Sequence, residues 1–81
     1  MIIEQVTERL ENALPGAKVD LQSQDMRHFS LVVVAEQFEG KSMIEQHQMI
    51  YSALGDAMEE AVHALTIRTF TPLQWEKIHG V

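Results

Sequence analysis

The spacing of hydrophobic residues changes several times along the chain, and each change predicts a different element. From residue 3 to residue 14, apolar residues recur every three or four positions, which predicts a helix with one buried face. Pro15 and Gly16 end this helix. Apolar and polar residues then alternate over 17–22, the period of a strand with one buried face. Residues 29–35 are mostly apolar and predict a central strand, buried on both faces and paired with the preceding strand in an antiparallel hairpin.

A second helix is predicted after the hairpin. Ser42 and Glu45 have the spacing of a capping box, in which each residue satisfies a free backbone donor of the other. Gly55 predicts a break, and a shorter helical turn over 56–61 follows it. We expect the apolar face of this helix to pack inward; its members are Met43, Ile44, His47, Ile50, Tyr51, Leu54 and Met58.

A third strand and a last short helix complete the predicted elements. Residues 64–70 alternate again between apolar and polar side chains, as a strand does. Thr71, Pro72 and Gln74 provide an N-cap, a proline at the first helical position and an acceptor at the third. The last helix therefore begins there, and Gly80 ends it.

This order of elements predicts the fold class. Three strands with helices between them favour an α/β (α+β) fold, in which helices cover a small mixed sheet in the order α-β-β-α-(turn)-β-α. The order is that of a KH-like (type II) fold, but the four glycines form no G-x-x-G loop to bring the backbone close to phosphates. No repeat, linker or low-complexity tract is found, so we expect residues 1–81 to form a single domain.

Composition and charge exclude several functional classes. Six Lys and Arg against twelve Asp and Glu give a net charge of −6, which argues against general affinity for nucleic-acid backbones. We find no catalytic triad, nucleophile elbow or phosphate-binding loop, and we expect a protein that is not an enzyme. The N-terminus lacks the pattern of a signal peptide, and the longest apolar run, over 31–35, is too short for a membrane span. We expect a cytoplasmic protein with no membrane partner.

The chain has no cysteine, so any metal that it binds must use histidines, carboxylates or a partner's residues. The histidines match no local zinc pattern, but His28 and His63 each stand where a predicted strand begins. Two strands that neighbour each other in one sheet would bring these histidines toward one edge. His47 is more simply explained as a satisfied residue at the core boundary, and His79 by its place near the end of the last helix.

Three stretches of the chain resemble the BolA family. Residues 62–75 resemble its C-terminal pattern of His-Ala-hydrophobic-Ser/Thr-Ile-Lys/Arg-x-x-Thr-Pro-x-x-Trp, while 28–34 and 38–51 are similar to its second strand and the start of its long helix. The resemblance implies a KH-like fold without G-x-x-G. It also implies a partner of a monothiol glutaredoxin, with which the chain would share a [2Fe–2S] cluster in iron–sulfur trafficking or in iron or redox sensing. Glutaredoxin and its glutathione would supply thiolates and the BolA-like chain nitrogen ligands.

The resemblance also implies site residues. His63 matches the family's C-terminal ligand histidine. The family's second ligand comes from the loop between the first two strands, where His28 is the only candidate in this chain. Two alternatives remain open: His28 ligates iron, or His63 acts with a labile or partner-supplied ligand. The residues expected to contact the partner are Arg68, Thr69, Thr71, Pro72 and Trp75. Gln46 replaces an arginine that the family often has, which weakens an anion-binding role there.

Other functions remain open from the sequence. Some BolA-like proteins are described as DNA-binding transcription regulators, and Lys41, Arg68 and Lys77 could form a local basic patch. The chain could instead hold glutaredoxin without a cluster, or form a homodimer on its own.

Overall fold

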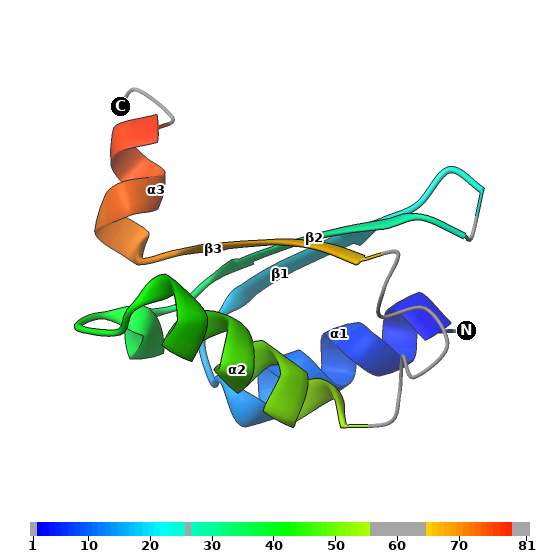
Figure 1. The fold of residues 1–81 in the computed structure, drawn as a ribbon, viewed down its shortest axis with the longest axis horizontal. Coiled ribbons are helices and arrows are strands. Elements are labelled where there is room, and N and C mark those ends of the chain that lie inside the picture. Colours follow the sequence, from blue (N-terminus) through cyan, green and yellow to red (C-terminus); the bar gives the residue numbers. More distant parts are fainter. Residues whose placement is uncertain (1, 26, 56–64, 79–81) are drawn as a thin grey trace.

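The computed structural model describes residues 2–25, 27–55 and 65–78 (Figure 1). The helices and strands are α1 (Ile2–Ala13), β1 (Lys18–Gln22), β2 (Phe29–Val34), α2 (Met43–Leu54), β3 (Leu65–Phe70) and α3 (Pro72–Ile78), with a short 3-10 helix, η1 (Glu36–Phe38), after β2. The predicted α+β fold and its element order are confirmed. The turn expected over 56–61 and the helix end expected at Gly80 lie outside the described residues.

The strands form one mixed sheet in the order β1-β2-β3. β1 and β2 are antiparallel, as predicted for a hairpin, whereas β2 and β3 are parallel. The parallel pairing places Phe29, the first residue of β2, opposite Leu65, the first residue of β3. α1 and α2 cover one face of the sheet, and α3 rises from the end of β3 on the other side (Figure 1).

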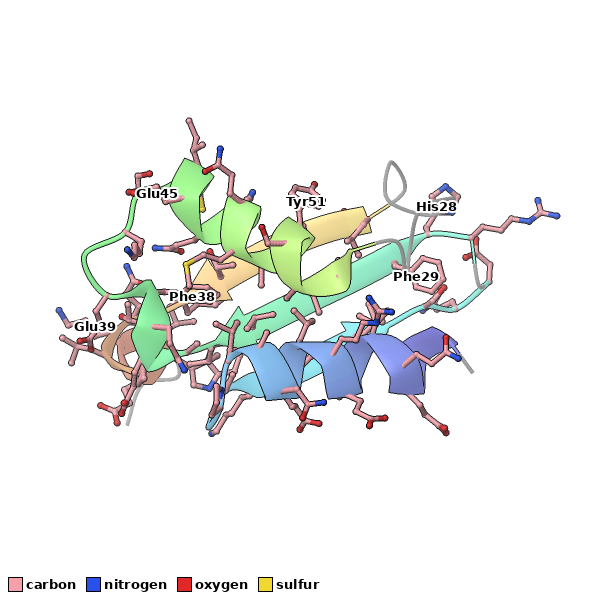
Figure 2. All side chains as sticks on the ribbon, turned by 90° about the horizontal axis from the view of Figure 1, so that it is seen from below. His28, Phe29, Phe38, Glu39, Glu45 and Tyr51 are labelled. Carbon is pink, nitrogen blue, oxygen red and sulfur yellow. The ribbon has the colours of Figure 1, made fainter. Side chains whose placement is uncertain are left out.

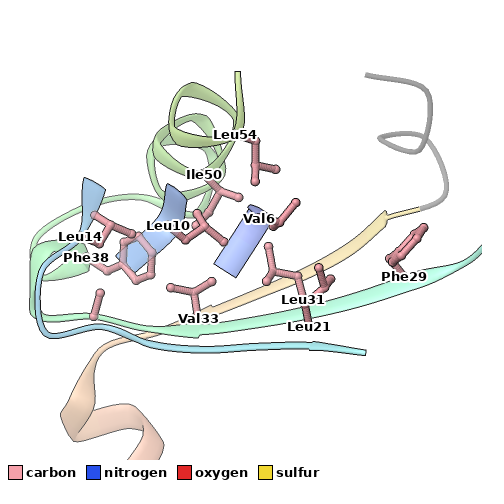
Figure 3. Packing of buried hydrophobic residues seen from close by; sticks show 11 residues of the cluster. Val6, Leu10, Leu14, Leu21, Phe29, Leu31, Val33, Phe38, Ile50 and Leu54 are labelled. Carbon is pink, nitrogen blue, oxygen red and sulfur yellow. The ribbon is translucent and has the colours of Figure 1, made fainter. Parts of the chain in front are cut away.

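The hydrophobic core fills the space between the sheet and the two helices α1 and α2 (Figure 3). Its buried members are Val6, Leu10, Leu14, Leu21, Phe29, Leu31, Val33, Ala35, Phe38, Ile50 and Leu54. The spacing of Val6 and Leu10 on α1 agrees with the predicted buried helical face. Leu31 and Val33 reach the core because alternate residues of β2 point to the same face.

The prediction that the central strand is buried on both faces is wrong. On the face away from α1 and α2, Ser30 is exposed and Val32 is half-buried. Only Val34 is buried there, beside its pairing neighbour Phe70 near α3. Because α3 has seven residues and stands at one end of the sheet, it covers only that end (Figure 1).

Both predicted capping boxes are present. The Glu45 backbone N–H donates to the Ser42 hydroxyl at 3.2 Å, and the Ser42 N–H donates to the Glu45 carboxylate at 2.9 Å. The same reciprocal bonds join Thr71 and Gln74 at 3.2 and 2.9 Å. Gly55 follows the last residue of α2 with φ of +55°, so the predicted break is also confirmed.

The face that α2 turns to the core differs from the predicted one. The predicted members Ile50 and Leu54 are buried, but His47 is half-buried and three others are exposed: Met43, Ile44 and Tyr51. Met58 lies outside the described residues. The position that takes their place in the core is Gln46, a polar residue.

Gln46 is buried because its amide has partners on three other segments. Its Nε2 donates to the carbonyls of Phe38 and Lys41 at 3.4 and 3.0 Å. Its Oε1 accepts a hydrogen bond from the Thr69 hydroxyl. A buried amide with these bonds avoids the cost of unsatisfied polar atoms and orients α2 against β3.

Candidate functional site

The loop between β1 and β2 is organised by the carboxylate of Asp25. Its Oδ1 accepts hydrogen bonds from the backbone N–H groups of Arg27 at 2.9 Å and His28 at 3.0 Å. The Ser23 hydroxyl donates to the His28 carbonyl at 2.7 Å across the base of the loop. These bonds hold the backbone on both sides of His28 in a defined conformation.

His28 presents an exposed imidazole at the loop end of the sheet, next to buried Phe29 (Figure 2). Its side chain is 81% exposed, and its Nδ1 lies 3.0 Å from Oδ2 of Asp25. Its Nε2 makes no hydrogen bond with any described residue. One ring nitrogen is therefore held by the protein and the other is available to a ligand.

The bonds that Asp25 accepts favour its charged form. The backbone N–H of His28, then the imidazole of His28 and the backbone N–H of Arg27, lower the pKa of the Asp25 carboxyl well below its usual range. Asp25 is consequently an ionised, acceptor-only group at neutral pH.

The loop borders a shallow hollow of about 490 Å³ that extends to the beginning of β3. His28 lines it from the end of the loop, Phe29 and Ser30 line it from β2, and Thr66 lines it from β3. His28 directly precedes β2, and His63 stands two residues before β3 in the sequence. His63 itself lies outside the described residues. The parallel pairing of Phe29 with Leu65 confirms that the strands following the two histidines begin side by side.

The other two histidines have different settings. His47 lies half-buried on α2, so its predicted place at the core boundary is confirmed. Its buried Nε2 has no hydrogen-bond partner among the described residues. This differs from the expectation that the imidazole is satisfied. His79 lies outside the described residues.

The residues expected to contact a partner lie near the end of β3 and in α3. Thr69 is only 5% exposed, and its hydroxyl is used within the chain by Gln46. Arg68 is exposed and pairs with Val32, on the sheet face that α1 and α2 leave open. The ring of Trp75 packs on Phe70 with centroids 5.4 Å apart, which agrees with an anchoring role for this tryptophan.

Thr71 and Pro72, the other two expected contact residues, begin α3. The Thr71 hydroxyl accepts the Gln74 N–H as the helix cap, and both Thr71 and Pro72 are half-buried. β3 separates them from the edge where His28 lies. With its six residues, this strand spans about 20 Å. The structure thus brings the starts of β2 and β3 together but keeps the expected contact residues of α3 at the opposite end of the sheet.

The described residues form no self-contained metal site. In residues 2–25, 27–55 and 65–78, no three His, Asp or Glu side chains are grouped so that they could hold a metal ion. The whole chain has no cysteine. If the imidazole of His28 bound a metal ion, the remaining ligands would have to come from elsewhere.

Asp25 is the site residue that sequence reasoning missed. The sequence indication was local. An aspartate whose carboxylate accepts hydrogen bonds from the backbone N–H groups two and three residues later is typical of turns. The predicted hairpin required a turn here but did not distinguish Asp25 from its neighbours.

None of the helices in the described part of the chain has the length and apolar character that crossing a membrane requires.

Comparison with known proteins identifies similar chains. A protein of Acinetobacter guillouiae described only as uncharacterised is 40% identical over 91% of this chain and 89% of its own length. The DNA-binding transcriptional regulator BolA of Escherichia coli is 32% identical over 94% of this chain and 81% of its own length. The match to human BolA-like protein 1 covers 57% of that longer protein.

Solved structures and a family model agree with these relatives. The BolA domain of SufE1 from Arabidopsis thaliana superposes with a TM-score of 0.73 at 30% identity, covering 86% of this chain and 91% of that domain. The model of the BolA-like protein family matches residues 4–74. The chain therefore belongs to the BolA-like family.

Proposed function

We propose that this chain is a non-enzymatic partner of a monothiol glutaredoxin and supplies histidine ligands, His63 and His28, to a [2Fe–2S] cluster that the two proteins share. Membership of the BolA-like family supports a regulatory or partner role over an enzymatic one. One relative is named a transcriptional regulator, and the BolA domain of SufE1 is part of a larger protein.

The observation that carries this proposal is the parallel pairing of β2 with β3. The strands that follow the two histidines in the sequence begin side by side at one end of the sheet. His28, the one that the structure describes, is exposed, and its Nε2 bonds to no described residue. The exposed imidazole of His28 at this end of the sheet supports the proposal.

The absence of cysteine supports a division of ligands between two proteins. A [2Fe–2S] cluster supplies electron-transfer or iron–sulfur donor chemistry when bound, and it is commonly held by four thiolates. This chain contributes none, so thiolates would come from glutaredoxin and glutathione. Replacing thiolate by neutral imidazole on one iron raises the reduction potential, which suits a cluster that is sensed or transferred.

Copurification with a monothiol glutaredoxin tests the proposal. The wild-type chain and the glutaredoxin are expected to form a coloured complex whose visible spectrum differs from that of the glutaredoxin alone. His63→Ala and His28→Ala should each alter this spectrum, because each removes an imidazole from the iron. His79→Ala is the matched control, since it removes a histidine that the family resemblance does not assign to the cluster.

The outcomes separate the alternatives. An unchanged spectrum for His63→Ala would contradict the assignment of His63 as a cluster ligand. A changed spectrum for His63→Ala with an unchanged one for His28→Ala would favour a labile or partner-supplied second ligand. A stable but colourless complex would indicate a module that holds glutaredoxin without a cluster.

DNA binding is the second candidate, and the name of the Escherichia coli relative favours it. Net charge −6 opposes it as a general mode, because binding to phosphate backbones depends on clustered cations. Lys41 lies near Glu45 beside α2, and Lys77 borders a different hollow with Met43. Arg68 projects from the open face of the sheet. The three cations of the expected patch therefore belong to different surfaces.

A mobility-shift titration at rising salt tests this second candidate. A nonspecific electrostatic contact should weaken steeply as salt approaches about 0.2 M. Sequence-selective binding that persists at that salt would support a DNA-binding role for this chain.

A further inference from the structure

The two oxygens of Asp25 have separate tasks in the hairpin loop. Oδ1 accepts the backbone N–H groups of Arg27 and His28, and Oδ2 faces the imidazole of His28. The loop and the ring are thus held by one carboxylate. The Ser23 hydroxyl donates to the His28 carbonyl at 2.7 Å and lies 3.4 Å from Oδ1 of Asp25, and neither contact involves the ring.

This arrangement selects one tautomer of His28. A carboxylate only accepts hydrogen bonds, so the ring nitrogen that faces it at 3.0 Å must carry the proton. A neutral imidazole has a single N–H, and a proton on Nδ1 leaves the lone pair on Nε2. A metal can bind only the nitrogen that has the lone pair.

We infer that Asp25 is a positioning residue for His28: it holds the neutral ring with Nδ1 protonated and presents Nε2 to the iron of the shared cluster. This inference rests on the proposed function. Histidine ligands in metal sites commonly donate their second N–H to a carboxylate or a carbonyl, which orients the ring and makes the ligand more basic. Here the loop already provides that partner without any metal.

The isolated chain permits a direct test by NMR. Two-bond correlations between ring protons and ¹⁵N distinguish the tautomers, and they are recorded at about pH 8, above the unperturbed pKa of histidine. Wild-type His28 is expected to carry its proton on Nδ1. Asp25→Asn keeps an oxygen for the backbone N–H groups but can turn its amide N–H₂ toward the ring, which favours a proton on Nε2.

Ser23→Ala is the matched control for the loop. It removes the hydroxyl that donates to the His28 carbonyl and lies 3.4 Å from Oδ1 of Asp25, and it leaves Oδ2 of Asp25 facing the ring. The tautomer is expected to stay as in the wild type. The inference is overturned if His28 has the same tautomer in wild type and Asp25→Asn, or if Ser23→Ala changes it as much as Asp25→Asn does.

Cluster retention in the glutaredoxin complex provides the second readout. Loss of such a carboxylate partner typically weakens metal binding 10- to 100-fold, so the cluster should leave the Asp25→Asn complex correspondingly faster. Wild-type retention in Asp25→Asn, or in His28→Ala, would overturn the inference and leave the partnership intact. Failure of the wild-type chain to form any coloured complex would contradict the proposed function, whereas the tautomer comparison on the isolated chain does not depend on that complex.

Discussion

At the scale of single residues, Gln46 shows how a polar side chain can define the packing of a small protein. Its amide joins the segment after β2, through the carbonyls of Phe38 and Lys41, to Thr69 of β3. Buried polar groups are costly when a partner is removed, because the remaining groups stay desolvated without a hydrogen bond. Gln46 therefore stabilises the fold more than an exposed glutamine of the same helix does.

Replacement of Gln46 by leucine tests this argument. Gln46→Leu removes the amide that accepts from the Thr69 hydroxyl and donates to the Lys41 carbonyl, and we expect the free energy of unfolding to fall by about 1–3 kcal/mol. Urea denaturation measures the change. Gln48→Leu, on the exposed side of the same helix, is the matched control and should change stability by less than about 0.5 kcal/mol. Equal effects of both substitutions would contradict the role of the buried amide.

The charge of Glu45 predicts a pH dependence of stability. The backbone N–H of Ser42, then the hydrogen bond with the Ser42 side chain, hold the pKa of Glu45 below its usual value of 4.5. A carboxyl with a lower pKa in the folded state stabilises that state above its unfolded pKa, and this contribution is lost as the pH falls through the folded pKa.

The stability difference between wild type and Glu45→Gln should accordingly be largest near pH 7. It should decline as the pH falls below about 4.5, where the carboxyl begins to be protonated in the unfolded chain. Denaturant titrations of both proteins over a series of pH values measure it. A difference that stays constant between pH 7 and pH 3 would show that the charge of Glu45 does not contribute.

At the scale of elements, local signals predicted where helices begin and end. The cap hydrogen bonds form within one helical turn, between Ser42 and Glu45 and between Thr71 and Gln74. The spacing of these residues alone was therefore sufficient to predict where each helix begins. The face that α2 buries could not be predicted in this way. It depends on Gln46, whose partner Thr69 lies 23 residues away in the sequence. Apolar spacing instead indicated Met43 and Ile44, which the structure leaves exposed.

The end of α2 gives a prediction at this scale. Gly55 has φ of +55°, and a Cβ there would lie 3.1 Å from Nη1 of Arg9, which donates to the Leu54 carbonyl at 3.0 Å. Gly55→Ala combines backbone strain with crowding of this link between α1 and α2. We expect a loss of about 1–3 kcal/mol in the free energy of unfolding.

Gly16→Ala separates the effect of backbone strain from the effect of crowding against Arg9. Gly16 also has a positive φ, of +84°, but an added Cβ would meet nothing within 4 Å. Gly16→Ala should therefore destabilise the chain less than Gly55→Ala in thermal or urea unfolding. A larger loss at Gly16 would contradict a role for the contact with Arg9.

At the scale of the whole molecule, the sheet separates two candidate regions. The expected ligand His28 precedes β2 at one end, whereas Trp75 and the start of α3 lie at the other. The sequence placed His28 and His63 before two strands, and the pairing of those strands agrees with this interpretation. The sequence could not predict that His28 and the start of α3 lie at opposite ends of the sheet, because strand direction and register depend on contacts across the whole chain.

This separation predicts that cluster ligation and partner binding can be lost independently. His28→Ala should change the visible spectrum of the complex yet leave capture of apo-glutaredoxin intact, because it alters one exposed side chain at the loop end. Arg68→Glu reverses a charge on the open face of the sheet and should weaken capture about tenfold, equivalent to about 1.4 kcal/mol, while the remaining complex keeps its spectrum. Lys41→Glu is the matched control, since it reverses an exposed cation that borders a different hollow, with Glu45 of α2. Equal weakening by Arg68→Glu and Lys41→Glu in a binding titration would indicate a general charge effect, and it would remove Arg68 from the predicted contact surface.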